Sequence, residues 1–229
     1  MTFWERLQAI IEETRRRTLG AALDALADHR VRRDEATFSI ALIALSAKMA
    51  KADGVVTDDE IAAFQDFFSF EEEDADKVRG VYALAQKDVA GYDHYLAQVA
   101  KIFENEPVVL EDVLDCLFHI AAADGVAHPR ELELLEAAAE RFAVSPASLR
   151  RIKSVHLGLG EDDPYVILDV SPSIGEDALK RAYHQLVKEH HPDAMIARGV
   201  PPALVKIAEG RIAAINAAYE QIRSERAYG

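Results

Sequence analysis

Apolar residues recur at three- and four-residue spacings along most of this chain of 229 residues, and no alternating run of β-branched residues interrupts them. This spacing is typical of amphipathic α-helices, so we predict an all-α fold. The prolines are few and lie between the apolar segments or at their first positions. The predicted helices cover about residues 3–29, 34–52, 58–68, 74–87, 92–103, 108–123, 129–142, 146–156, 176–190 and 202–224.

A break in this pattern divides the chain. Residues 156–162 contain two glycines and the start of an acidic run, which disfavour helix and indicate a linker. We therefore predict an N-terminal amphipathic helix over residues 1–33, a helical domain over 34–155 and a second small domain over 163–229.

The first domain contains a repeated segment. Residues 52–60 read Ala-Asp-Gly-Val-Val-Thr-Asp-Asp-Glu, and residues 123–131 read Ala-Asp-Gly-Val-Ala-His-Pro-Arg-Glu. An apolar helix is predicted before and after each copy, which indicates an internal duplication. The arrangement resembles the TerB-like domain of tellurite-resistance proteins over roughly residues 34–152. This resemblance implies a helical bundle with a two-fold repeat.

Carboxylates in the repeat raise the question of a metal site, because hard cations prefer oxygen ligands. The candidates from the two copies are Asp53, Glu60, Asp124 and Glu131. The EF-hand spacing is not met, since glycine directly follows the first aspartate of each copy. Metal binding is the weaker interpretation, and we expect no cofactor.

Helix termini explain the same residues better. Gly54 and Gly125 suit the left-handed conformation that ends a helix. Thr57 and Glu60 have the spacing of a capping box, and Pro129 suits the first position of a helix with Glu131 at the third.

Charge, cysteine content and the length of the apolar runs disfavour several classes of protein. The formal net charge is −14 and the pI about 5.0, which argues against a nucleic-acid partner. Cys116 is the only cysteine, so no intrachain disulfide can form, and we expect it to be a small buried apolar residue. The first helix is too charged for a signal peptide, and the apolar stretch 36–47 is shorter than the about 20 residues that a membrane span needs. We expect a cytoplasmic protein without a membrane span.

The N-terminal helix differs in charge from the rest, with seven arginines against five acidic residues in 1–33. Its apolar stripe lies opposite Arg15–Arg17. We expect the stripe to pack on its own domain or in a homodimer, and peripheral contact with an anionic membrane is the alternative.

The second domain carries the most informative motifs. It contains a Tyr-x-x-Leu-x-Val segment, a basic helix, a His-Pro-Asp turn and a final helix with Asn-x-Ala-Tyr. These are Tyr165, Leu168 and Val170; Lys180, Arg181 and Lys188; His191, Pro192 and Asp193; and Asn216, Ala218 and Tyr219. Together they closely resemble the J-domain of DnaJ co-chaperones. The resemblance implies that His191, Pro192 and Asp193 contact a DnaK-type chaperone ATPase and couple docking to ATP hydrolysis.

Helical periodicity supports a hairpin independently. Two stripes fall at three- and four-residue steps, and two such helices bury them against each other as an antiparallel pair. The stripes are Leu179, Tyr183, Leu186 and His190 in the first helix, and Ala208, Ile212, Ile215, Tyr219 and Ile222 in the second. His190 is therefore predicted to be buried. His191 is predicted to lie exposed, because Pro192 ends the regular helix.

The other face of the first helix carries Lys180, His184 and Lys188 at i, i+4 and i+8, with Arg181 beside them. A basic face on an acidic protein indicates an acidic protein partner, since charge complementarity orients and accelerates the encounter. A catalytic His191–Asp193 pair is disfavoured because no serine or cysteine stands near it in sequence and an exposed turn makes a poor pocket. We therefore expect an activator of a partner ATPase rather than an enzyme.

The combination of both domains resembles the bacterial DjlA type of co-chaperone. We predict a co-chaperone that recruits and stimulates a DnaK-type ATPase, while its TerB-like domain selects a location or an unidentified client. The alternatives are a metal-responsive stress protein and a scaffold that binds a partner without stimulating it.

Overall fold

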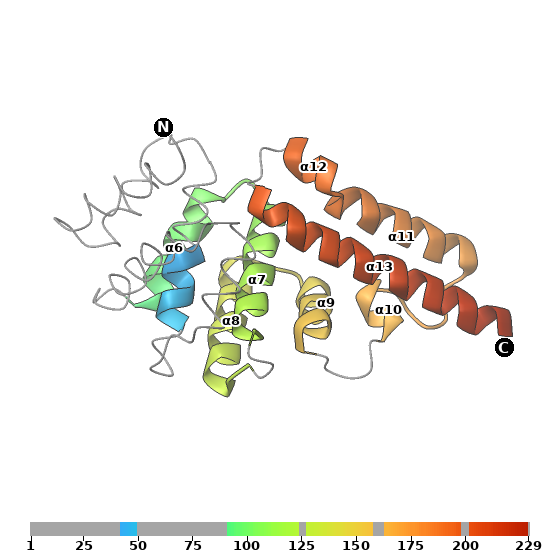
Figure 1. The fold of residues 1–229 in the computed structure, drawn as a ribbon, viewed down its shortest axis with the longest axis horizontal. Helices are drawn as coiled ribbons and strands as arrows, with labels where there is room; N and C mark the ends of the chain where they lie inside the picture. Colours follow the sequence, from blue (N-terminus) through green and yellow to red (C-terminus); the bar gives the residue numbers. More distant parts are fainter. Residues whose placement is uncertain (1–41, 50–90, 124–126, 158–162, 198–201, 229) are drawn as a thin grey trace. The chain divides into compact units, whose positions relative to one another are not determined.

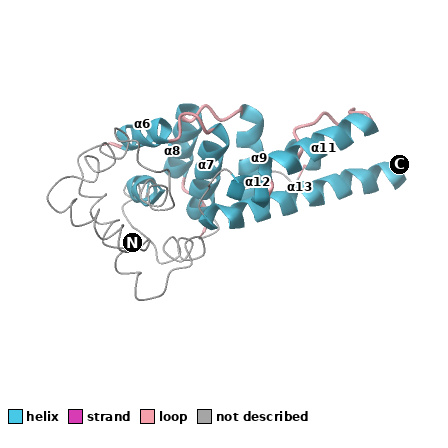
Figure 2. Cartoon of the chain, turned by 90° about the horizontal axis from the view of Figure 1, so that it is seen from above, coloured by secondary structure: helices cyan, strands magenta, loops and turns pink. Residues whose placement is uncertain are grey.

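The computed structural model describes residues 42–49, 91–123, 127–157, 163–197 and 202–228. Within these ranges all regular structure is helical, and no strand occurs (Figure 2). Residues 42–49 are helical. The labelled helices in Figure 1 are α6 (Tyr92–Ile102), α7 (Pro107–Ala121), α8 (Pro129–Arg141), α9 (Pro146–Leu157), α10 (Pro164–Ile167), α11 (Glu176–His190), α12 (Pro192–Ala197) and α13 (Pro202–Tyr228).

The described helices follow the predicted ones closely. α11 has the predicted bounds, and α6 to α9 differ from prediction by one or two residues at their ends. α13 continues to Tyr228, beyond the predicted end at residue 224. The sequence missed α10 and the short helix α12, which follows the His-Pro-Asp turn. Four and six residues are too few to establish a helical period.

The predicted helices over residues 3–29, 58–68 and 74–87 lie outside the described residues. The first copy of the repeat and the glycine of the second copy lie outside them too. The internal repeat therefore stays a prediction.

The chain forms two compact units, Met1–Ala143 and Val144–Gly229. In the first unit, α7 and α6 both pack against α8. α7 is apolar around most of its circumference, and Val113, Leu117 and Phe118 are all fully buried, as expected of a helix inside a bundle. Cys116 lies buried in the same helix, which confirms the expectation for it.

The second unit is organised around α13, which contacts α10, α11 and α12. Figure 1 shows α11 and α13 lying side by side with opposite chain directions, the antiparallel pair that the apolar stripes predict. The core of this unit consists of Ile167, Leu168, Leu179, Ile215, Ala218 and Ile222. Although α13 has 27 residues, no helix in the described part of the chain is long and apolar enough to cross a membrane.

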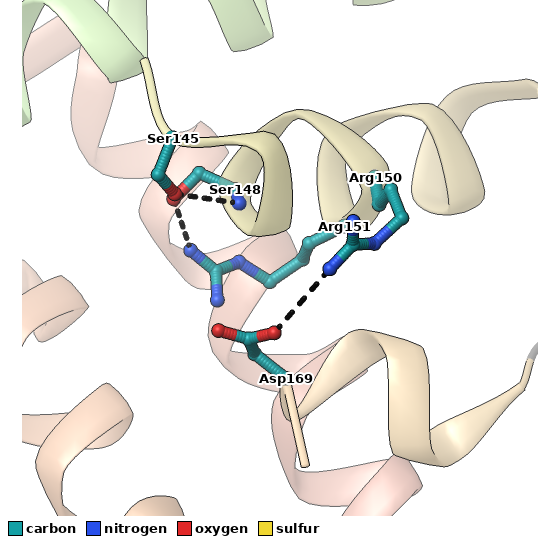
Figure 3. Close-up of polar contacts among 5 residues, drawn as sticks. All are labelled: Ser145, Ser148, Arg150, Arg151 and Asp169. Carbon is teal, nitrogen blue, oxygen red and sulfur yellow. Dashed lines mark hydrogen bonds and ion pairs between the residues drawn. The ribbon is translucent and has the colours of Figure 1, made fainter. Parts of the chain in front are cut away.

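The helix α9 belongs to this second unit and packs on α10. Arg150 of α9 forms an ion pair with Asp169, which follows α10, at 3.6 Å (Figure 3). Asp169 adopts a positive φ of 52°, a left-handed conformation that aspartate tolerates better than most residues. The side chains of Arg150 and Asp169 are 59% and 50% exposed, so the ion pair contributes no more than about 1 kcal/mol to the free energy of unfolding.

The start of α9 is held by its own polar side chains. The Ser145 hydroxyl accepts a hydrogen bond from the Ser148 amide at 3.0 Å, which is the usual arrangement of a serine N-cap. The buried Arg151 guanidinium donates to the Ser148 hydroxyl at 3.0 Å, as Figure 3 shows. These bonds fix the first turn of the helix that contacts α10.

Candidate functional site

The candidate site is built on α11, whose buried side is as predicted. Leu179 and His190 are buried, and Tyr183 and Leu186 pack half-buried against the core of the second unit. The helix begins with Glu176 and Asp177, acidic residues that interact favourably with a helix N-terminus.

Aromatic stacking fixes the middle of α11 on α13. The rings of Tyr183 and Tyr219 are stacked, with centroids 4.1 Å apart and planes 11° apart. The Tyr183 hydroxyl donates a hydrogen bond to Oδ1 of Asn216 at 3.0 Å. Such an aromatic pair contributes about 0.5–1.5 kcal/mol beyond the burial of its surface. The Asn-x-Ala-Tyr motif of α13 therefore holds the helix pair together.

A buried polar contact fixes the C-terminal end of α11. Nη1 of Arg211, on α13, lies 2.8 Å from Nδ1 of His190, and both residues are buried, with exposed fractions of 3% and 4%. An arginine side chain keeps its proton and has no acceptor, so the guanidinium donates and Nδ1 accepts. The ring hydrogen of His190 is therefore on Nε2.

Sequence reasoning missed Arg211, although a signal was present. Arg211 lies three residues after Ala208 and four before Ile215, two members of the predicted buried stripe. A charged residue inside an apolar stripe requires a buried partner. The structure supplies that partner from α11.

The turn after α11 exposes the next histidine. His191 is extended, with φ −65° and ψ 133°, and Pro192 begins α12. A residue before proline favours extended backbone, and proline suits the first position of a helix. The side chains of His191 and Asp193 are 47% and 87% exposed. The structure thus buries His190 and exposes His191, as the sequence predicts.

A local hydrogen bond orders this turn. The Asp193 amide donates to Nδ1 of His191 at 3.1 Å. Oδ2 of Asp193 lies 3.6 Å from the same nitrogen, and this contact is an ion pair only when the ring is protonated. The amide contact is the shorter one and requires an unprotonated Nδ1, so it defines the turn. The ring then offers Nε2–H as its donor.

The basic face of α11 comprises Lys180, Arg181, His184 and Lys188, and all four residues are exposed. Lys180, His184 and Lys188 are spaced by four residues, so they line one side of the helix over about 12 Å. The structure thus places the basic face on the helix that leads directly into the turn of His191, Pro192 and Asp193.

The repeat residues that the structure describes form a helix cap. Glu131 Oε2 accepts from the His128 amide at 2.9 Å, and Nδ1 of His128 accepts from the Arg130 amide at 3.3 Å. Pro129 is at the first helical position and Glu131 at the third, which confirms the predicted placement of both. His128 as N-cap was not predicted. Asp53, Glu60 and Asp124 lie outside the described residues.

We predict that the chain binds neither calcium nor magnesium more tightly than about millimolar, the weak end for oxygen-ligand sites. The reason is that Glu131 caps its own helix, and no group of three His, Cys, Asp or Glu among the described residues could hold a metal. Calorimetric titration of the full chain with each cation measures this. A micromolar isotherm that disappears in the double variant Asp53→Asn with Asp124→Asn would contradict the prediction.

Comparison with known proteins gives two family matches. The model described as tellurite resistance protein TerB matches residues 39–154, and the DnaJ domain model matches residues 163–227. The chain is 28% identical to the co-chaperone protein DjlA of Photobacterium profundum over 85% of this chain and 79% of that protein. It is 26% identical to DjlA of Aliivibrio fischeri over 84% and 80%, and 28% identical to DjlA of Escherichia coli K12 over 50% and 51%. No solved structure matches the chain.

Proposed function

Because the chain belongs to the TerB family and carries a DnaJ domain over residues 163–227, we propose that it is a co-chaperone of a DnaK-type ATPase. It recruits this ATPase and stimulates its ATP hydrolysis. The TerB-like part selects the client or the location at which this happens. The relatives named co-chaperone support this proposal.

One observation carries the proposal above all. α11 carries the exposed basic face, and the exposed His-Pro-Asp turn follows directly at its C-terminal end. This helix is fixed to α13 through Tyr183 and His190. The site is therefore a preorganised protein-docking surface, since its two parts need no rearrangement to meet one partner. Lys180, Arg181, His184 and Lys188 attract the acidic partner, and His191, Pro192 and Asp193 contact it.

The same geometry supports an activator rather than an enzyme. His191 and Asp193 are close to each other but stand on an exposed turn. General acid–base chemistry needs a substrate held within hydrogen-bond reach in an oriented pocket. A surface turn suits contact with another protein, in whose active site the chemistry takes place.

We predict that Lys180→Ala combined with Lys188→Ala slows association with the ATPase and leaves its dissociation rate nearly unchanged. The lost charges act at long range during the encounter, whereas the contacts of the turn remain. Raising the salt concentration should have the same effect on the wild type, because salt screens exposed charges. Surface plasmon resonance at several salt concentrations measures both rates.

The control for this pair removes equal charge elsewhere. Lys101→Ala combined with Lys206→Ala lowers the net charge equally but leaves the basic face of α11 intact. It should associate nearly as fast as the wild type. A wild-type association rate that does not depend on salt, or an equal effect of both double variants, would show that the face does not steer the partner.

A further inference from the structure

We infer that Arg211 is a positioning residue: through its hydrogen bond to His190 it holds the end of α11 so that the adjoining His191–Asp193 turn is presented to the ATPase. This inference rests on the proposed function. It assigns a role to a side chain whose hydrogen bond to His190 reaches the residue just before the turn.

Arg211 is a charged residue at a buried position that an apolar residue could also occupy. Arg211 has 3% of its surface exposed and lies on the buried stripe of α13 between Ala208 and Ile215, which are both fully buried. Burying a guanidinium removes its hydration, and well-packed apolar residues often stabilise such a place as well or better. What the guanidinium adds is a directed bond to one atom, Nδ1 of His190, at 2.8 Å.

The hydrogen bond to His190 matters because His190 lies at the C-terminal end of α11, next to the turn. His190 is the last residue of α11, and His191 follows in extended conformation. The final carbonyls of a helix lack partners within the helix, so its last turn frays easily unless a side chain holds it. Arg211 holds it at the residue that precedes the turn. The hydrogen bond between the Asp193 amide and His191 then forms directly after a residue whose position is fixed.

The opposite end of α11 has its own arginine, which provides a matched comparison. Nη1 of Arg226 donates to the Ile174 carbonyl at 2.9 Å, and Nη2 donates to the Pro172 carbonyl at 3.2 Å. Arg226 also lies over the ring of Tyr165, 5.8 Å from its centroid. Arg226 thus ties the segment just before α11 to α13, whereas Arg211 bonds to the last residue of α11, next to the turn.

The two halves of the site should therefore respond differently when Arg211 is replaced. The basic face around Lys180 and His184 lies on earlier turns of α11, which Tyr183 still fixes through Tyr219 and Asn216. Recruitment of the ATPase should persist. Stimulation should fall, because a displacement of about 1 Å in a positioned group can reduce a rate by up to about a hundredfold.

The test compares Arg211→Met, Arg211→Lys and Arg226→Met in the full chain. Two quantities are measured in ATPase titrations: the concentration for half-maximal stimulation and the maximal stimulation. Arg211→Met should lower the maximum about tenfold while the half-maximal concentration changes by less than about twofold. Arg211→Lys, which keeps a charged donor, should recover part of the maximum. Arg226→Met should lower the melting temperature but keep the maximum.

A second readout needs no partner and separates this inference from the proposed function. In NMR spectra of the free chain, the Asp193 amide resonance should shift in Arg211→Met and stay in place in Arg226→Met. If the wild type fails to stimulate any ATPase, the proposed function fails, and the amide shift alone decides the role of Arg211. Wild-type amide position in Arg211→Met, or equal loss of stimulation in both methionine variants, would overturn the inference. If Arg211→Met does not fold, Arg211→Lys decides, and the inference falls if that variant is indistinguishable from wild type in both readouts.

Discussion

His191→Gln is expected to abolish stimulation of the DnaK-type ATPase while the chain stays folded. The His191 side chain is 47% exposed and accepts a hydrogen bond from the Asp193 amide within its own turn. Substitutions at such exposed positions change the free energy of unfolding by about 0.5 kcal/mol or less. The glutamine lacks the imidazole ring and its Nε2–H, the groups that the proposed docking presents to the ATPase. Thermal melting and single-turnover hydrolysis of ATP measure the two effects.

The neighbouring histidine is the matched control. His190→Gln removes a buried ring and the fixed acceptor for Arg211, so it should lower the free energy of unfolding by about 1–3 kcal/mol, the cost of a disturbed buried hydrogen bond. Because the same hydrogen bond is inferred to position the turn, His190→Gln should lower stimulation as well, and the free energy of unfolding is the quantity that distinguishes the two variants. Normal stimulation by His191→Gln with a verified partner would contradict the docking mechanism. Unfolding of His191→Gln would contradict its placement on the surface.

Ile215→Ala is expected to have the largest effect on stability, lowering the free energy of unfolding of the second unit by about 2–5 kcal/mol. Ile215 is fully buried at the centre of the core that joins α10, α11 and α13, with Leu168 and Leu179 as neighbours in that core. Truncation leaves a cavity where three helices meet. Since small domains are stable by only about 5–15 kcal/mol, this loss is a large fraction of the total.

Urea unfolding followed by circular dichroism measures this loss, with Val155→Ala as the control. Val155, on α9 of the same unit, is 39% exposed, so its truncation should cost no more than about 0.5 kcal/mol. The variant Ile215→Ala should also lose stimulation in proportion to the unfolded fraction. If Ile215→Ala and Val155→Ala unfold at the same urea concentration as the wild type, the described core would be wrong.

The sequence predicted most of the second unit because its elements are long and strongly periodic. The bounds of α11, the antiparallel pairing with α13 and the opposite placements of His190 and His191 all follow from apolar spacing and one proline. The residues of the basic face were predicted as a group because one helix carries them all. Such features depend on contacts within one element or between two neighbouring stripes.

The features that could not be predicted from the sequence depend on contacts between residues that are far apart in the chain, or on very short elements. The packing of α9 on α10 involves Arg150 and Asp169, two exposed residues without a distinctive pattern around them. The hydrogen bonds from Arg226 to the Pro172 and Ile174 carbonyls use backbone acceptors, which no side-chain motif reveals. Arg211 is different, because its charge within an apolar stripe was a readable signal.

The measurement that tests the central proposal most directly is single-turnover ATP hydrolysis by the cognate DnaK-type chaperone, with increasing amounts of the full wild-type chain. The proposal predicts that the hydrolysis rate rises with the concentration of the chain and reaches a plateau, and that His191→Gln removes this rise. A parallel binding measurement shows whether the two proteins associate under the same conditions. A chain that binds the chaperone but leaves the hydrolysis rate unchanged at every concentration would contradict the proposal and indicate a non-stimulating scaffold.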